Sequence, residues 1–295
     1  LLETVWYEHT QPPLFPAFVG LLLKLSPFPD GITFQVAYLA MGLALVLVLR
    51  RLAEVIGLGR TATFVAIALV VLNPGLAAIE FSASYDQPTI LLTALFILGI
   101  ARYASEPSLR NLTWVTTAAA GAVLVRTVYH PAWYLLLVAG LLVVRRPTIP
   151  IRPLVAALAV PGLLIGVFVV KNQVLYGEAA LTTWGGPSLS KIAGAAALPP
   201  ARKALIEDGT VSPLFGRYVF GSYDSYADAM PPCTPKHPDI PVLAQPLRPM
   251  NGSPNLNYEC FLSVYRQQGK DARAYLAARP GRFLGAQLSG GQMFF

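Results

Sequence analysis

Repeated apolar runs constrain this chain more than any other feature of its sequence. Six stretches within the first 170 residues are almost free of charge and approach the length that a helix needs to cross a bilayer: 32–49, 61–79, 88–103, 113–125, 130–144 and 153–170. Only 13% of the 295 residues are charged, against about 25% in soluble domains. The runs therefore predict an all-α polytopic membrane protein with about six spans.

The residues on either side of these spans complete the predicted organisation. The run 15–25 is too short to span, which indicates an interfacial helix, so we interpret 1–30 as the end of a first outer loop. Residues 31–170 form the helical core. Residues 171–295 form a mixed, partly irregular extracytoplasmic segment, with short helices at 189–206 and 256–278 and Pro-rich loops between them. Because the chain begins with leucine and ends on apolar residues, we expect it to be a fragment whose end leads into a truncated further helix.

Arginine is concentrated in alternate loops. One set of loops holds Arg50, Arg51, Arg60, Arg102, Arg110, Arg145, Arg146 and Arg152, and the opposite set holds Lys24, Arg126 and Lys171. Basic loops remain in the cytoplasm, so we expect the opposite ends and the C-terminal segment to be extracytoplasmic. The net charge of +7 therefore reflects membrane orientation, and no nucleic-acid partner is predicted.

Ionisable residues at the mouth of a membrane segment are functional hypotheses by default. Glu8 and His9 precede the interfacial helix, where either side chain can act as a general base or hold a substrate hydroxyl. The alternative is a solvated loop end. Asp86 opens the span 88–103 and can be a second outer carboxylate, with Tyr85 beside it to stack on a sugar. The alternative for Asp86 is a helix cap.

Basic and aromatic residues lie at the same outer ends. Arg126 can hold a phosphate through paired N–H donors, with His130 opening the next span. The alternative is an arginine that snorkels to lipid headgroups inside an aromatic belt. Lys171 and Asn172 leave the last span, and Trp184 follows them. Lys171 can meet a phosphate and Trp184 can stack on a sugar, or each can be an interfacial anchor.

Two cysteines, Cys233 and Cys260, fall in the extracytoplasmic segment, where a disulfide can form. Two free thiols are the alternative. The sequence contains no P-loop, CxxC, HExxH or G-x-S-x-G motif. Nothing therefore indicates an ATP-driven pump or a zinc site, and no metal ligands are assigned.

Several segments together resemble a known family. QPPLFPAFVGLLLKL, LVLVLRRLAEVIG, SYDQPTILLTALFILGIARY, AGAVLVRTVYHPAWYLLL and KNQVLYGEAALTTWGG follow one another in the order seen in membrane glycosyltransferases of the GT-C fold. The chain is most similar to the protein O-mannosyltransferase and aminoarabinose transferase group. The likeness covers about residues 7–190, and it lies in order and spacing more than in any single motif.

The resemblance implies a GT-C-like helical bundle that moves a sugar from a polyprenyl-phosphate donor to an acceptor hydroxyl, with inversion. Gln11 stands where the family has the histidine of H-P-P-L, and Asp86 matches an acidic position that opens a later helix. The family's catalytic acid lies in the first outer loop, where Glu8 is among the nearest visible acids. Arg126 or Lys171 would stabilise the leaving lipid phosphate.

The implied partners are membrane lipid, the lipid-linked sugar phosphate as donor substrate, and a glycan, lipid or protein acceptor. No other cofactor is implied. A transporter or flippase for a lipid or small solute is the alternative function, and a membrane scaffold with a binding tail is a third. Polar residues at the outer ends of spans, rather than at mid-depth, favour the enzyme.

Overall fold

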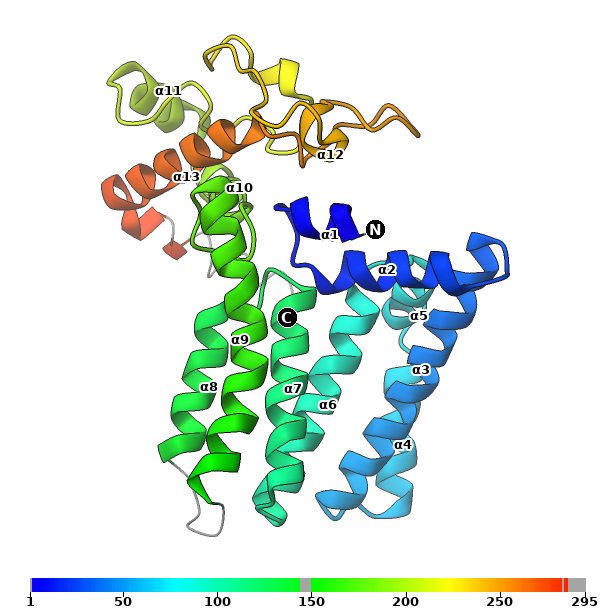
Figure 1. Ribbon diagram of the computed structural model, residues 1–295. Coiled ribbons are helices and arrows are strands. Elements are labelled where there is room, and N and C mark those ends of the chain that lie inside the picture. The colour runs from blue at the N-terminus through cyan, green and yellow to red at the C-terminus, as the bar shows by residue number, and fades with distance from the viewer. Residues whose placement is uncertain (1, 144–149, 283, 286–295) are drawn as a thin grey trace. The chain divides into compact units, whose positions relative to one another are not determined.

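The computed structural model of the protein describes residues 2–143, 150–282, 284 and 285, and no strand occurs among them (Figure 1). The chain divides into two compact units, each of which is described by itself. Unit 1 comprises Leu1–Trp6 and Gln11–Leu181, and unit 2 comprises Tyr7–Thr10 and Thr182–Phe295. The predicted division between residues 170 and 171 falls inside a helix, and the units instead divide between residues 181 and 182.

Unit 1 is a helical bundle. Its helices are α1 (Leu2–Tyr7, whose last residue belongs to unit 2), α2 (Leu14–Leu25), α3 (Asp30–Val55), α4 (Arg60–Val71), α5 (Pro74–Phe81), α6 (Asp86–Ser105), α7 (Leu109–Val125), α8 (Pro131–Val143) and α9 (Ile151–Tyr176). Among the described residues, α3, α6 and α9 are long and apolar enough to cross a membrane, and the pair α4–α5 would add a fourth span. These helices confirm the predicted all-helical, membrane-type class.

The predicted span 61–79 is broken into two helices. Helices α4 and α5 are bent by 54° relative to each other. Pro74 has no N–H to continue the ladder of α4. The side chain of Asn73 accepts a hydrogen bond from the Gly75 N–H at 2.8 Å and so caps the new helix. The Asn73 cap and Pro74 therefore divide the apolar run into two helices.

Helix α7 has the least pronounced apolar run of the predicted spans and is buried along most of its length. Eleven of its 17 residues are buried, among them the small residues Ala118, Ala119 and Ala122. The Thr116 hydroxyl donates to the Ala157 carbonyl of α9 at 2.8 Å. A helix that faces protein rather than lipid needs small side chains for close approach, which explains its low apolarity.

Helices α6, α7, α8 and α9 run alternately up and down in unit 1 (Figure 1). Residues at the start of one helix and at the end of the next therefore share one end of the unit. Asp86 begins α6, Arg126 follows α7, and Lys171 lies in the last turns of α9, so these three residues share one end. The other end carries Arg50, Arg51, Arg60, Arg102, Arg110 and Arg152. Arg145 and Arg146 lie outside the described residues.

Unit 2 is built around two helices that pack closely. Its helices are α10 (Gly185–Ala196), α11 (Pro199–Glu207), the 3₁₀ turn η1 (Tyr223–Tyr226), α12 (Pro241–Ala244) and α13 (Phe261–Ala278). A Cβ at Gly186 of α10 would lie 2.2 Å from the Tyr265 carbonyl oxygen of α13, so only glycine allows this approach. The long stretches between the helices are irregular, as the proline content predicts.

Two predicted helices of this segment have different bounds in the structure. The predicted helix 189–206 is two helices, because Pro199 and Pro200 end one and begin the next. The predicted helix 256–278 begins only at Phe261, after the turn in which the Tyr258 carbonyl accepts from the Phe261 N–H. The predicted continuation into a further membrane helix falls mostly on residues 286–295, outside the described residues.

Candidate functional site

Asp86 and Arg126 form an ion pair at the end of unit 1 where α6 begins and α7 ends. An NH1 hydrogen of Arg126 is donated to Oδ1 of Asp86, and the Ser84 hydroxyl donates to Oδ2 at 3.0 Å. The side chain of Arg126 is 36% exposed and that of Asp86 is 30% exposed. The guanidinium carbon also lies 4.9 Å from the centre of the Tyr85 ring. Three residues singled out from the sequence are therefore brought together here.

The loop that delivers Asp86 is tightly wound. Ala83 has a φ of 45°, a backbone conformation that non-glycine residues rarely adopt. The Tyr38 hydroxyl of α3 donates to the Ser84 carbonyl at 2.6 Å and holds the loop against the bundle. Strained loops that are held by their surroundings are often found at functional sites. Asp86 itself lies in the first turn of α6, and no side-chain cap hydrogen bond is made by the residue at the helix start, Tyr85.

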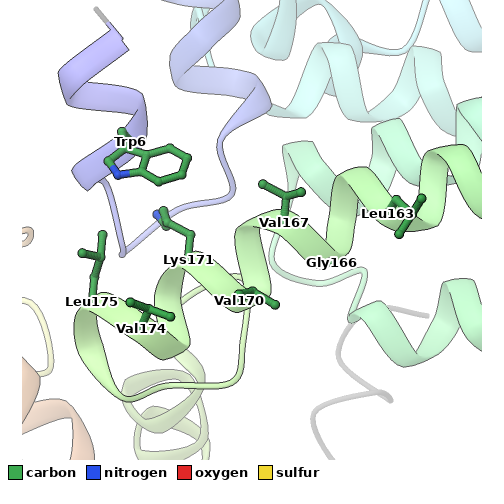
Figure 2. Close-up of a pocket in the computed structure, with 8 residues that line it drawn as sticks. All are labelled: Trp6, Leu163, Gly166, Val167, Val170, Lys171, Val174 and Leu175. Carbon is green, nitrogen blue, oxygen red and sulfur yellow. The ribbon is translucent and has the colours of Figure 1, made fainter.

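The second feature of this end is an apolar groove of about 510 Å³ along α9. Figure 2 shows its lining, in which Lys171 reaches from α9 toward Trp6 of α1. The residues that line it are Trp6, Leu163, Gly166, Val167, Val170, Lys171, Val174 and Leu175. Lys171 is 5% exposed, and its ammonium lies 5.8 Å from the ring centres of both Phe168 and Tyr176. One cationic side chain thus lies among the otherwise apolar residues that line the groove.

The other sequence-predicted residues of unit 1 have structural contacts. The Asn172 side chain is fully buried and donates to the Ala180 carbonyl at 2.8 Å, which fixes the turn after α9. Nδ1 of His130 accepts from the Ala132 N–H at 3.1 Å and so caps the start of α8. Gln11 is half-buried at the start of this unit's second segment. Their predicted binding roles stay predictions.

Glu8 and His9 belong to unit 2, whereas Asp86 belongs to unit 1. Nε2 of His9 lies 3.0 Å from the Asn257 carbonyl, and Nδ1 lies 2.8 Å from the Thr183 hydroxyl. A carbonyl only accepts, so Nε2 carries a proton. Since His9 is fully buried and both ring nitrogens contact protein groups, this geometry favours anchoring over proton transfer. Glu8 is half-buried and accepts from the Thr10 hydroxyl at 3.0 Å.

Trp184 and the two cysteines also lie in unit 2. The Trp184 ring packs against Phe220, with 5.2 Å between ring centres, so part of the face predicted for a sugar is already covered. Cys233 and Cys260 form a disulfide with a Cα–Cα distance of 5.8 Å. Burial raises the pKa of the nearby Tyr226 and Tyr265 above the ordinary tyrosine value, so both hydroxyls stay protonated donors even at alkaline pH. The Tyr265 hydroxyl donates to the Leu256 carbonyl at 2.9 Å.

Two polar residues at the same end of unit 1 as Asp86 are absent from the sequence-based site. The side chains of Glu80 and Gln87 both approach the Cβ position of Gly42 of α3, and Gln87 is fully buried. The available sequence signal was a carboxylate, Glu80, at the end of an apolar run. Gln87 has no such signal, because an amide beside Asp86 resembles ordinary helix-start chemistry. Among the described residues, no group of three or more His, Cys, Asp or Glu side chains is arranged to hold a metal ion.

Comparison of the chain with protein families, with curated proteins and with solved structures gives no significant match.

Proposed function

We propose that this chain is an integral membrane glycosyltransferase of GT-C type. It moves a sugar from a polyprenyl-phosphate donor to an acceptor hydroxyl at the extracytoplasmic side, with inversion. The observation that carries the proposal is the apolar groove of α9, whose lining includes the buried Lys171. A polyprenyl phosphate combines a long apolar chain with an anionic head, and this groove offers apolar walls and one ammonium.

The ion pair at the same end of unit 1 supports the same proposal. Arg126 has N–H groups beyond the one donated to Asp86, and these suit a phosphate oxygen. In the proposed reaction a carboxylate takes the proton of the acceptor hydroxyl while its oxygen attacks the anomeric carbon. The bond from that carbon to the phosphate oxygen breaks, and the cations stabilise the charge left on the lipid phosphate.

The test is transfer by the purified full-length chain in proteoliposomes, with radiolabelled polyprenyl-phosphate sugars as donors. Gly166→Leu places a side chain in the groove, and nothing lies within 4 Å of a Cβ at this position, so the helix bundle is undisturbed. We expect donor binding to weaken at least about tenfold, a loss of roughly 1.4 kcal/mol.

Gly140→Leu on α8 is the matched control. Gly140 also has nothing within 4 Å of a Cβ, is exposed, and does not line the groove. We expect this variant to bind and transfer like the wild type. Equal donor affinity in both variants would show that the groove does not bind the donor. Absence of transfer from every donor would overturn the enzyme itself.

A transporter or flippase is the second candidate function. The bent pair α4–α5 favours it, since broken helices often form the substrate sites of transporters. The same proteoliposomes separate the two functions. Movement of labelled lipid or solute across the vesicle membrane, without transfer of sugar, would select the transporter.

A further inference from the structure

Glu80 lies against the backbone of α3 at the outer end of unit 1. A Cβ built on Gly42 would be 1.8 Å from Oε1 of Glu80 and 3.0 Å from its carboxyl carbon. No side chain other than hydrogen leaves room for the carboxylate in this position. Glycine at residue 42 therefore determines where the Glu80 carboxylate lies.

Gln87 approaches the same point from α6. Its Nε2 lies 3.7 Å from the Cβ position of Gly42, the point that Glu80 also approaches. The side chain is fully buried, and neither its Nε2 nor its Oε1 has a hydrogen-bond partner among the described residues. Buried amides are nearly always hydrogen-bonded, so an unpartnered one requires an explanation. The amide and the Glu80 carboxylate thus approach the same point on α3.

Glu80 and Asp86 differ in their surroundings. The Asp86 carboxylate accepts from Arg126 and from the Ser84 hydroxyl, so both of its oxygens are engaged. Within the part of the chain that the structure describes, Glu80 makes no ion pair and no side-chain hydrogen bond. The lone pairs of Glu80 are thus free to accept a proton, whereas those of Asp86 already hold Arg126 in place.

Helix geometry brings Glu80 to this position. Glu80 is the penultimate residue of α5, and the 54° bend after α4 turns this short helix against α3. The strained residue Ala83 then reverses the chain into α6, where Gln87 lies in the first turn. The break in the predicted span lets a carboxylate and an amide from adjacent helices approach the same point on α3.

We propose that Glu80 accepts the proton of the acceptor hydroxyl and that Gln87 is a positioning residue for its carboxylate. This inference rests on the proposed glycosyltransferase function. The O–H bond of the acceptor breaks and its proton passes to Glu80. The acceptor oxygen bonds to the anomeric carbon, and the electron pair of the breaking carbon–oxygen bond leaves with the lipid phosphate.

The other titratable groups at this end of the neighbouring helices are few. They are Tyr38 and the exposed Asp30 on α3, and Asp86 on α6, which is paired with Arg126. Arg60 of α4 lies at the opposite end. A pH profile that depends on Glu80 can therefore be separated from these groups by substitution.

The test compares Glu80→Gln with the wild type in the transfer assay. We expect the transfer rate to fall by about 100-fold or more, while the affinity for the donor changes less than about twofold. We also expect the rise of the wild-type rate with pH to disappear. A Glu80→Gln rate close to that of the wild type would overturn the role of Glu80 and leave the proposed function intact.

Gly42→Ala supplies a second variant that keeps the carboxylate. The new methyl group pushes the Glu80 carboxylate, the end of a flexible side chain, out of position, so we expect a rate at least about tenfold lower with an unchanged Tm and donor affinity. Gly31→Ala on the same helix has open space and should match the wild type. Loss of donor binding in Glu80→Gln would make Glu80 a binding residue and overturn the proposal. No transfer by the wild type would overturn the function and the inference together.

Discussion

At the scale of residues, the two histidines of the predicted site have opposite environments. His9 is fully buried and contacts Thr183 and Asn257 through both ring nitrogens. His130 is exposed and only caps α8 through Nδ1. The same side chain therefore serves the interior of unit 2 in one place and a helix end of unit 1 in the other.

This difference predicts the effect of removing each ring. His9→Ala should lower the free energy of unfolding by about 2 kcal/mol, because it leaves buried polar partners unsatisfied. The corresponding decrease in Tm is about 5 °C, measurable by intrinsic fluorescence during heating of the purified chain in detergent. His130→Ala, the control, should change the free energy by less than about 1 kcal/mol. If His9→Ala abolished transfer without any change in Tm, His9 would return as a catalytic candidate.

The partner of Asp86 became visible only in the structure. The sequence allows either a helix cap or an outer carboxylate, and the structure pairs this residue with Arg126, 40 positions later. The pair is about one-third exposed, and exposed ion pairs contribute only about 0.2–1 kcal/mol to stability. Its main consequence is therefore to orient the guanidinium over Tyr85.

At the scale of elements, the start of α13 is tied to a loop by the disulfide. Cys260 precedes α13 and is buried, whereas Cys233 is exposed in the Pro-rich stretch. The two cysteines are 27 residues apart. Closing a loop of this length restricts the unfolded chain and stabilises the fold by about 3 kcal/mol.

Cys233→Ser tests this contribution with little change to the packing, because the substituted residue is exposed. We expect unit 2 to lose about 3 kcal/mol of stability, seen as a lower Tm of the full chain in detergent. Reductant should lower the Tm of the wild type by a similar amount and leave that of Cys233→Ser unchanged. A reductant effect of equal size in both proteins would show that the stabilisation has another source.

At the scale of the whole molecule, the arginine-rich end of unit 1 predicts membrane orientation. Both native cysteines are in the disulfide, so an introduced cysteine is the one free thiol. Ser105→Cys lies at the arginine-rich end and Thr127→Cys at the other, and both positions are exposed. In intact cells a membrane-impermeant thiol reagent should label Thr127→Cys and spare Ser105→Cys. The reverse pattern would invert the orientation and place Asp86 at the cytoplasmic side.

Much of unit 1 could be predicted because helix faces that would contact lipid need large apolar side chains, and these are visible in the sequence. The exposed faces of α3 and α9 carry large apolar side chains such as Leu39, Leu43, Leu163 and Val167. Helix α7 has a weaker apolar signal in the sequence, because a helix that is enclosed by protein needs small side chains. The break between α4 and α5 follows from Asn73 and Pro74. The mean hydropathy of the whole run 61–79 does not reveal the effect of these two residues.

The sequence by itself determined the helical membrane class, the arginine asymmetry and the location of Asp86, Arg126 and Lys171 at one shared end of the bundle. These are local properties, since each depends on composition within one span or one loop. Only the tertiary structure decided that Asp86 pairs with Arg126, that His9 is buried within unit 2, and that Glu80 and Gln87 both approach Gly42. Contacts between distant residues depend on how helices bend and on the space that a glycine leaves. Neither property can be derived from the sequence of one segment alone.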